Sequence, residues 1–125
     1  IKEAETPEQK IRIALDFIID RLVFDLPLNR VFYNLIQMVF ERKELNAAVR
    51  MMFENYRKQL ADIFRQLGAG NESDLLGGSL VAITEGFALQ NMVDPGALNR
   101  KDVSFVITKM IHDRLNLTIS VNPPD

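Results

Sequence analysis

The spacing of apolar residues predicts helices along almost the whole chain. Apolar side chains recur every three or four positions, which is the repeat of a helix face packed on a core. No stretch competes as a strand, apart from a weak alternation of apolar and polar residues over residues 117–121. The pattern therefore predicts an all-α fold, an antiparallel helical bundle of five to six helices that forms a single domain over residues 1–125.

Proline and capping residues set the expected bounds of the first two helices. The first opens at Thr6, with Pro7 at the first helical position and Gln9 placed to complete a capping box. Pro27 disfavours helical backbone at the residue before it, so the first helix is expected to stop near that point. A second helix is expected over about residues 28–42.

The remaining breaks in the pattern predict three further helices. A charged cluster at residues 41–44 indicates a break, and Gly68 is placed to cap the end of the helix that follows. The Asp-Pro-Gly sequence at residues 94–96 ends the next helix. These helices are expected over about residues 44–67, 73–93 and 100–115, followed by a loose tail over residues 116–125.

The helix expected over residues 73–93 has apolar residues on several sides, whereas an ordinary surface helix has one apolar face. Large side chains make up one face: Leu76, Leu80, Ile83 and Phe87. A second face consists of Ser79, Ala82, Gly86, Leu89 and Val93. Glycine inside a helix costs about 1 kcal/mol relative to alanine, so Gly86 favours a close helix contact. Because one small domain has one core, the second face predicts contact with a partner chain; the alternative is that the last helix of the same chain covers it.

The end of this helix resembles a sequence pattern of the TetR family of bacterial transcription regulators. Residues 85–98 read EGFALQNMVDPGAL. The family's pattern in its penultimate helix is similar: an acidic residue, Gly-Leu-Ala-Leu-Gln, an apolar pair, then Asp-Pro and Leu. Phe87 stands where leucine is common. Residues 44–67, in which Arg57 follows Tyr56, also resemble the long helix that precedes the family's dimerisation helices.

The resemblance implies the effector-binding and dimerisation domain of a TetR-type transcriptional repressor. Such proteins bind DNA through an N-terminal helix-turn-helix that these 125 residues lack, so DNA is expected as a partner only through that part. Binding of a small molecule among the earlier helices alters the affinity for DNA. The last two helices pack with those of a second copy as a four-helix dimer interface. The expected interface residues are Ser79, Ala82, Gly86, Leu89, Gln90, Val93, Phe105, Val106 and Lys109.

An effector pocket is expected among the apolar side chains of the earlier helices, because ligand pockets are mostly apolar with a few polar anchors. The candidate residues are Phe17, Phe32, Tyr33, Met52, Phe53, Tyr56, Phe64, Leu80 and Thr84. Arg50 and Glu85 are the only charges considered for this lining, so the expected effector is a small apolar or amphipathic compound. The alternative for each aromatic or methionine at helical spacing is an ordinary core position.

Composition narrows the classes of function. The net charge of −2 provides no basic field that would attract nucleic acid. Cysteine is absent, which excludes disulfides and fits the cytoplasmic location that we expect. No apolar run reaches the roughly 18 residues that span a membrane, and the charged residues 1–5 do not fit a signal peptide. Because the first residue is Ile1 rather than Met, we expect the chain to be part of a longer protein.

No arrangement of residues predicts catalysis or metal binding. His112 is the only histidine, and it lies near the end of the last helix, where a cation suits the helix dipole. No clustered ligands accompany it, so neither a metal nor another cofactor is expected. Asp16 and Asp20 share a helix face with arginines and are interpreted as a solvated charged surface rather than an acid–base pair. We expect a protein that is not an enzyme; the alternative to the sensor domain is a helical protein–protein interaction module, an adaptor or a chaperone, without a small-molecule pocket.

Overall fold

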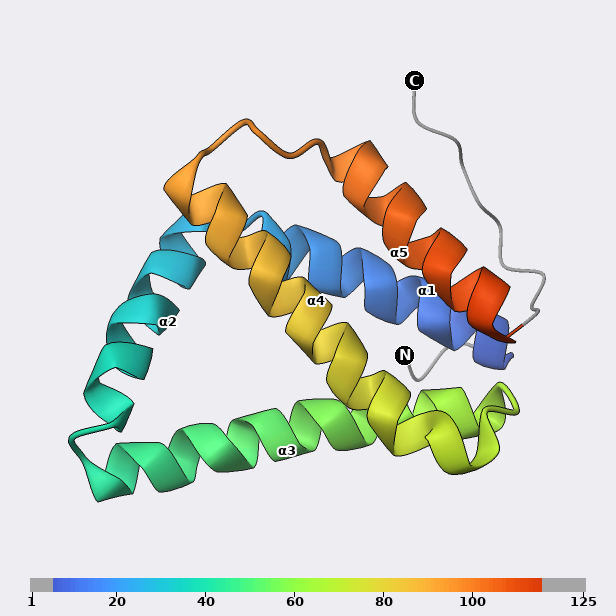
Figure 1. Cartoon of the computed structure of the whole chain (residues 1–125), viewed down its shortest axis with the longest axis horizontal. Helices are drawn as coiled ribbons and strands as arrows, with labels where there is room; N and C mark the ends of the chain where they lie inside the picture. Colours follow the sequence, from blue (N-terminus) through green and yellow to red (C-terminus); the bar gives the residue numbers. More distant parts are fainter. Residues whose placement is uncertain (1–5, 116–125) are drawn as a thin grey trace.

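The computed structural model describes residues 6–115, and these form helices joined by short connections (Figure 1). The α-helices are α1 (Pro7–Phe17), α2 (Leu26–Val39), α3 (Lys43–Gln66), α4 (Ser73–Val93) and α5 (Arg100–Leu115). A π-helical segment, η1 (Ile18–Val23), continues α1, and a short 3₁₀ turn, η2 (Gly70–Glu72), precedes α4. No strand occurs within residues 6–115. The predicted all-α fold of five to six helices is therefore confirmed, with five α-helices in the described residues.

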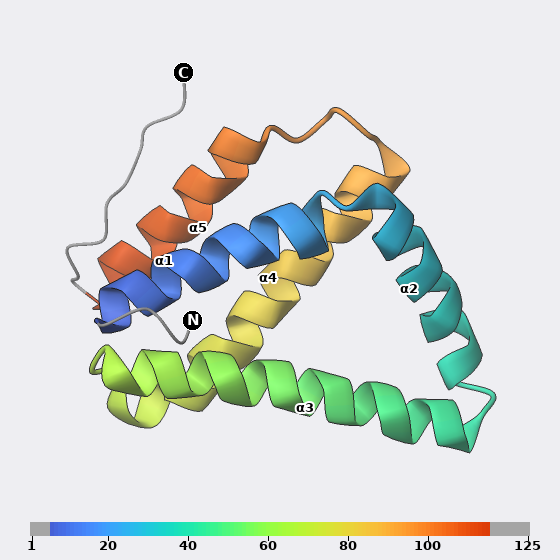
Figure 2. The ribbon, with the colours of Figure 1, turned by 180° about the vertical axis from the view of Figure 1, so that it is seen from behind.

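Helix α4 is the central element of the bundle. It contacts α2, α3 and η1, whereas α5 packs against α1 and η1. Figures 1 and 2 show the same arrangement from opposite sides: α5 runs beside α1, and α4 crosses the far end of α3 before it passes α2. The position of α4 explains why its sequence is apolar on several sides.

Buried side chains are concentrated at one end of the domain, where α1, η1, the second half of α3, α4 and α5 converge. The largest of them are Phe64, Ile11, Leu15, Ile19 and Ile107. Full burial of an apolar side chain of this size stabilises the folded state by about 1.5–3 kcal/mol relative to leaving it exposed. The end of the domain that buries these side chains therefore provides most of this stabilisation. By contrast, α2 and the first half of α3 bury only Asn29, Val39 and Val49. This sparsely packed end is where room for a ligand can exist.

The local features that set the bounds of the first helix are as predicted. The Thr6 hydroxyl oxygen accepts a hydrogen bond from the Gln9 backbone N–H at 3.1 Å, and the Gln9 side chain accepts one from the Thr6 N–H at 3.0 Å. The capping box is therefore confirmed. The π-helical geometry of the last six residues was not predicted, because the apolar spacing there differs little from that of an α-helix.

The predicted start of the second helix is wrong by two residues, since α2 begins at Leu26 rather than near residue 28. Asp25 caps this helix: its side chain accepts a hydrogen bond from the Leu28 N–H at 3.1 Å. Pro27 then lies in the first turn, where no backbone N–H is needed for the helix. The same helix ends at Val39, three residues before the predicted end.

The other three helices lie close to their predicted bounds. Gly68 has a φ of +90° after the end of α3, the left-handed conformation predicted for its cap. The breaks at residues 41–44 and 94–96 are also confirmed, to within a residue or two. The predicted tail over residues 116–125, with its weak alternation at 117–121, lies outside the described residues.

Helices α3 and α4 touch through their backbones at Gly77. A Cβ atom on Gly77 would lie 2.7 Å from the carbonyl oxygen of Arg57 and 3.0 Å from the backbone nitrogen of Ala61. Neither atom belongs to a flexible side chain, so only glycine permits this crossing. Gly77 thereby sets the separation of α3 and α4 at this crossing, and both helices also line the first two cavities described below.

Two buried amides join the end of η1 to the neighbouring helices. The Asn29 side chain in α2 donates a hydrogen bond to the carbonyl oxygen of Val23 at 3.2 Å, and the Asn91 side chain in α4 donates one to the same oxygen at 3.4 Å. A carbonyl at a helix end lacks a partner within its own helix. The two asparagines supply hydrogen-bond donors for this carbonyl oxygen, so α2 and α4 are both linked to the end of η1.

Candidate ligand-binding site

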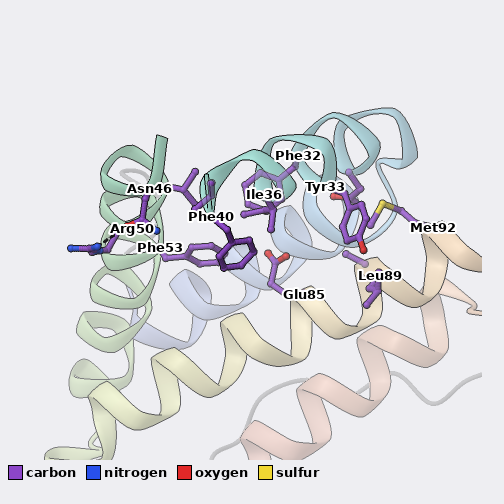
Figure 3. Close-up of a pocket in the computed structure, with 14 residues that line it drawn as sticks. Phe32, Tyr33, Ile36, Phe40, Asn46, Arg50, Phe53, Glu85, Leu89 and Met92 are labelled. Atoms are coloured by element: carbon purple, nitrogen blue, oxygen red, sulfur yellow. Dashed lines mark hydrogen bonds between the residues drawn. The ribbon is translucent and has the colours of Figure 1, made fainter. Parts of the chain in front are cut away.

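A cavity of about 520 Å³ lies between α2, the first half of α3 and the second half of α4 (Figure 3). Aromatic rings form much of its wall: Phe32, Tyr33, Phe40 and Phe53. The rings of Phe32 and Phe53 pack edge to face, with centroids 6.1 Å apart and planes at 64°. The volume falls within the range of small-molecule pockets, roughly 300–1,000 Å³.

A second cavity, of about 290 Å³, lies on the other side of α3 and α4, against α1 and η1. Its wall is largely apolar and includes Ile13, Phe17, Leu22 and Tyr56. The Thr84 hydroxyl in this wall donates a hydrogen bond to the carbonyl oxygen of Leu80 at 2.8 Å. The two cavities therefore share the same central helix but face different parts of the fold.

A third cavity, of about 550 Å³, opens between α4 and α5, and a fourth, of about 410 Å³, lies between α2 and the end of α4. The third is bordered by the core residues Phe64, Leu80 and Ile107 together with Ser79 and Met110. It thus lies on the side of the domain where the last two helices meet.

The nine predicted ligand-binding residues fall into different places in the fold. Phe32, Tyr33 and Phe53 line the first cavity; Phe17, Tyr56 and Thr84 line the second; Phe64 and Leu80 border the third. Met52 lines none of these four cavities. Phe64 is 2% exposed and Leu80 3% exposed, so both are chiefly core residues. The predicted set is not a single lining, and whether any member binds a ligand stays a prediction.

Glu85 lines both the first and the second cavity, and the predicted set did not include it. Its side chain is half-buried, and it makes no hydrogen bond or ion pair with any residue in the described range 6–115. Figure 3 shows its carboxylate directed away from α4 and into the first cavity, toward α2 and the ring of Phe53. The burial raises the pKa of the Glu85 carboxyl.

Glu85 lies on a third face of α4, which explains why its side chain borders both cavities. The residues of this face recur with helical spacing and line one or both of the first two cavities: Val81, Thr84, Glu85, Ala88 and Met92. Of the two faces found from the sequence, the first lies on another side of the helix, whereas Leu89 of the second also lines the first cavity. Glu85 and Arg50, the two charges considered for the lining from the sequence, both line the first cavity.

The second face of α4 is exposed, and α5 does not cover it. All five of its residues, from Ser79 to Val93, are exposed, and Val93 is 78% exposed. A Cβ atom on Gly86 would meet nothing within 4 Å, so nothing within residues 6–115 requires a glycine there. Of the other expected interface residues, Gln90, Val106 and Lys109 are exposed and Phe105 is half-buried.

A protein-family model described as the C-terminal domain of BetI-type transcriptional repressors matches residues 7–116. The chain belongs to this family. No curated protein and no solved structure matched it. The predicted resemblance to the C-terminal domains of TetR-family regulators is therefore confirmed, and the family is one of transcription regulators.

None of the helices described in this BetI-type domain is long and apolar enough to cross a membrane. Asp16 on α1 and Asp20 on η1 are exposed to solvent, as expected from the sequence, and both pair with arginines. Arg12 donates hydrogen bonds to Asp16 at 2.8 Å and to the Thr108 hydroxyl at 3.1 Å, and Arg100 forms an ion pair with Asp20. The hydrogen bond from Arg100 lowers the pKa of the Asp20 carboxyl. These pairs join α1 and η1 to α5 at the surface of the BetI-type domain.

His112 is half-buried, and its Nδ1 lies 3.2 Å from a carboxylate oxygen of the neighbouring Asp113. Within residues 6–115 no three histidine or acidic side chains gather to hold a metal ion. The neighbouring carboxylate gives His112 of the BetI-type domain a local partner at the end of α5.

The raised pKa of Glu85 makes the stability of the BetI-type domain depend on pH. The folded state holds this proton more tightly than the unfolded state, so the stabilisation is present below the ordinary glutamate pKa of about 4.3 and is lost as pH rises through the higher folded value. Glu85→Gln is therefore expected to raise the melting temperature at pH 7 by a few degrees, and this gain should vanish near pH 4. Melting curves across this range, with exposed Glu54→Gln as control, test it. Equal gains at both pH values would contradict it.

Proposed function

We propose that this domain is the effector-binding and dimerisation domain of a TetR-type repressor that acts as a homodimer in the bacterial cytoplasm. A small molecule bound in the domain would change the DNA affinity of an N-terminal helix-turn-helix outside these residues. The observation that carries the proposal is the aromatic cavity of about 520 Å³ at the sparsely packed end of a domain of this family. Such a cavity favours this function over an interaction module with a solid core.

Helix α4 supports a link between ligand and dimer. One side of the helix lines the first two cavities, and the exposed small-residue face adjoins that side at Leu89, which belongs to both. A ligand that fits one position of α4 better than another shifts the population toward that position. The same shift would move the face against which the second copy packs. Ile13 and Phe17 in α1 border the second cavity, so the helix nearest the N-terminus lies against the site.

Filling the first cavity tests the ligand site. Ile36→Trp in α2 places a larger side chain in the lining, and it is expected to weaken binding of the neutral apolar probe N-phenyl-1-naphthylamine at least about tenfold, or about 1.4 kcal/mol. Probe fluorescence in a titration measures the affinity. Val31→Trp on the exposed side of α2 is the matched control. Absence of probe binding, or equal affinity in Ile36→Trp, would contradict a ligand site in this cavity.

A large side chain at Gly86 tests the dimer. Gly86→Leu leaves the fold of one copy unhindered, because nothing lies within 4 Å of the added Cβ. It is expected to raise the dimer dissociation constant at least about tenfold, since close packing of helices depends on small residues. Sedimentation analysis measures the constant, and Ala48→Leu on the exposed surface of α3 is the control. A wild-type protein that stays monomeric at micromolar concentration would overturn the dimer.

A further inference from the structure

Asn29 is a buried polar side chain in the wall of the first cavity. It is 7% exposed, so more than nine-tenths of the residue is removed from solvent. Buried polar groups in folded proteins almost always have a hydrogen-bond partner. An amide has both a donor end and an acceptor end, so each end of the Asn29 side chain calls for a partner of its own.

The donor end of this amide is engaged, and the acceptor end is open. The Asn29 Nδ2 donates to the Val23 carbonyl oxygen at 3.2 Å, which fixes the orientation of the amide. Its Oδ1 accepts no hydrogen bond from any residue in the range 6–115. Within that range, no side-chain oxygen or nitrogen that is closed off from solvent lacks a partner, so Oδ1 is reachable. Of the four cavities, Asn29 lines only the first.

The other polar groups of this lining are satisfied or less enclosed. Arg50 donates a hydrogen bond to the Asn46 side-chain oxygen at 2.6 Å, and Figure 3 shows the two together at the edge of the cavity. Glu85 is half-buried and Tyr33 is exposed. Asn29 is therefore the one buried polar residue of the lining, and it presents an acceptor without a donor.

We propose that Asn29 determines ligand specificity: its Oδ1 accepts a hydrogen bond from an uncharged donor, a hydroxyl or an amide N–H, on a ligand whose apolar body fills the first cavity. This inference rests on the proposed function, since it names the chemical class of the effector. A charge at this depth, beside a neutral amide, would lose more hydration than a hydroxyl does. A ligand without a donor would close Oδ1 off from water and leave it unpaired, which is unfavourable.

The same amide links the ligand to the end of η1. A hydrogen bond accepted at Oδ1 strengthens the bond that Nδ2 donates to Val23, because linked hydrogen bonds polarise one another. Asn91 in α4 donates to the same carbonyl oxygen at 3.4 Å but lines none of the four cavities. Asn91 is therefore a matched control, with the same side chain and the same partner but no access to the ligand.

Diphenylmethanol and benzophenone test the proposal, because they share one carbon skeleton and differ in a single group. The alcohol donates a hydrogen bond, whereas the ketone only accepts. Isothermal titration of the wild-type domain is expected to give the alcohol at least about a tenfold lower dissociation constant than the ketone. Asn29→Leu is expected to remove this preference and to leave ketone affinity within about twofold. Asn91→Leu loses the other hydrogen bond to Val23 and should retain the preference.

The outcomes separate this inference from the function on which it rests. If N-phenyl-1-naphthylamine binds and Ile36→Trp weakens it, but alcohol and ketone bind wild type equally, the cavity stands and the role of Asn29 is wrong. This comparison needs no variant at Asn29. A preference that persists in Asn29→Leu, or that is lost equally in Asn91→Leu, would also overturn it, as would no binding of the alcohol up to its solubility. Retained ketone binding in Asn29→Leu shows that the variant is folded.

Discussion

Gly77→Ala is expected to lower the free energy of unfolding by about 2 kcal/mol, although alanine is the better helix former. The helix propensity alone would stabilise the protein by about 1 kcal/mol. The added methyl group, however, would lie 2.7 Å from the carbonyl oxygen of Arg57 and 3.0 Å from the nitrogen of Ala61. Because both are backbone atoms, the whole of α3 must move away from α4, and overpacking of this kind costs about 1–3 kcal/mol or more.

The neighbouring glycine provides the control for this prediction. A Cβ atom on Gly78 would lie 3.5 Å from the Cδ of Arg57, which is an ordinary contact with a flexible side chain. Gly78→Ala is therefore expected to be neutral or to stabilise the domain by up to about 1 kcal/mol. Urea denaturation measures both variants. If the two substitutions shift the midpoint in the same direction and by similar amounts, the backbone contact at Gly77 does not limit the helix separation.

Phe64→Ala is expected to cost about 3–5 kcal/mol, a large share of the 5–15 kcal/mol that stabilise a typical domain. Its ring is 2% exposed and lies in the core formed by α1, α3, α4 and α5. Phe53, also in α3, is half-buried and lines the first cavity. Phe53→Ala should cost clearly less in stability, because its ring already borders open space, and should weaken binding of the apolar probe instead.

Unfolding curves and probe titrations on the two phenylalanine variants measure this contrast. The sequence placed both rings in one predicted lining, whereas the structure separates them into core and cavity. A stability loss at Phe53 as large as that at Phe64 would mean that the first cavity is closed and packed in solution. A reduced probe affinity in folded Phe64→Ala would mean that the core end also takes part in binding.

The parts of the fold that could be predicted are those decided by neighbouring residues. Thr6 and Gln9 form the capping box because their groups lie within one turn, and Gly68 follows the end of α3 because glycine readily adopts positive φ. The start of α2 was wrong because two local rules compete there. Pro27 disfavours helix before it, but Asp25 caps the helix and allows proline in its first turn.

The candidate site could be predicted only in part, because a helix pattern shows which residues share a face and not which neighbour that face meets. Phe32 and Phe53 were predicted together and do meet, since α2 and α3 are joined by a short turn. Phe17 and Phe64 were assigned to the same lining, yet distant packing places one beside a cavity and the other in the core. Glu85 was considered as a charge of the lining, but its lack of a partner depends on the absence of cations among the lining residues of three other elements, which the sequence does not show.

The change of side between Glu85 and Gly86 has a consequence for how such a protein can diversify. Consecutive residues of an α-helix point about 100° apart, so the first faces the cavities and the second the open surface. Selection on the shape and charge of the cavity therefore acts on Glu85, whereas selection on the exposed face acts on Gly86. Under the proposed function, a mutation at the first position would alter the ligand preference and leave the proposed dimer face unchanged. On that proposal, a single nucleotide change could give a new specificity without a compensating change in the face expected to meet a second copy.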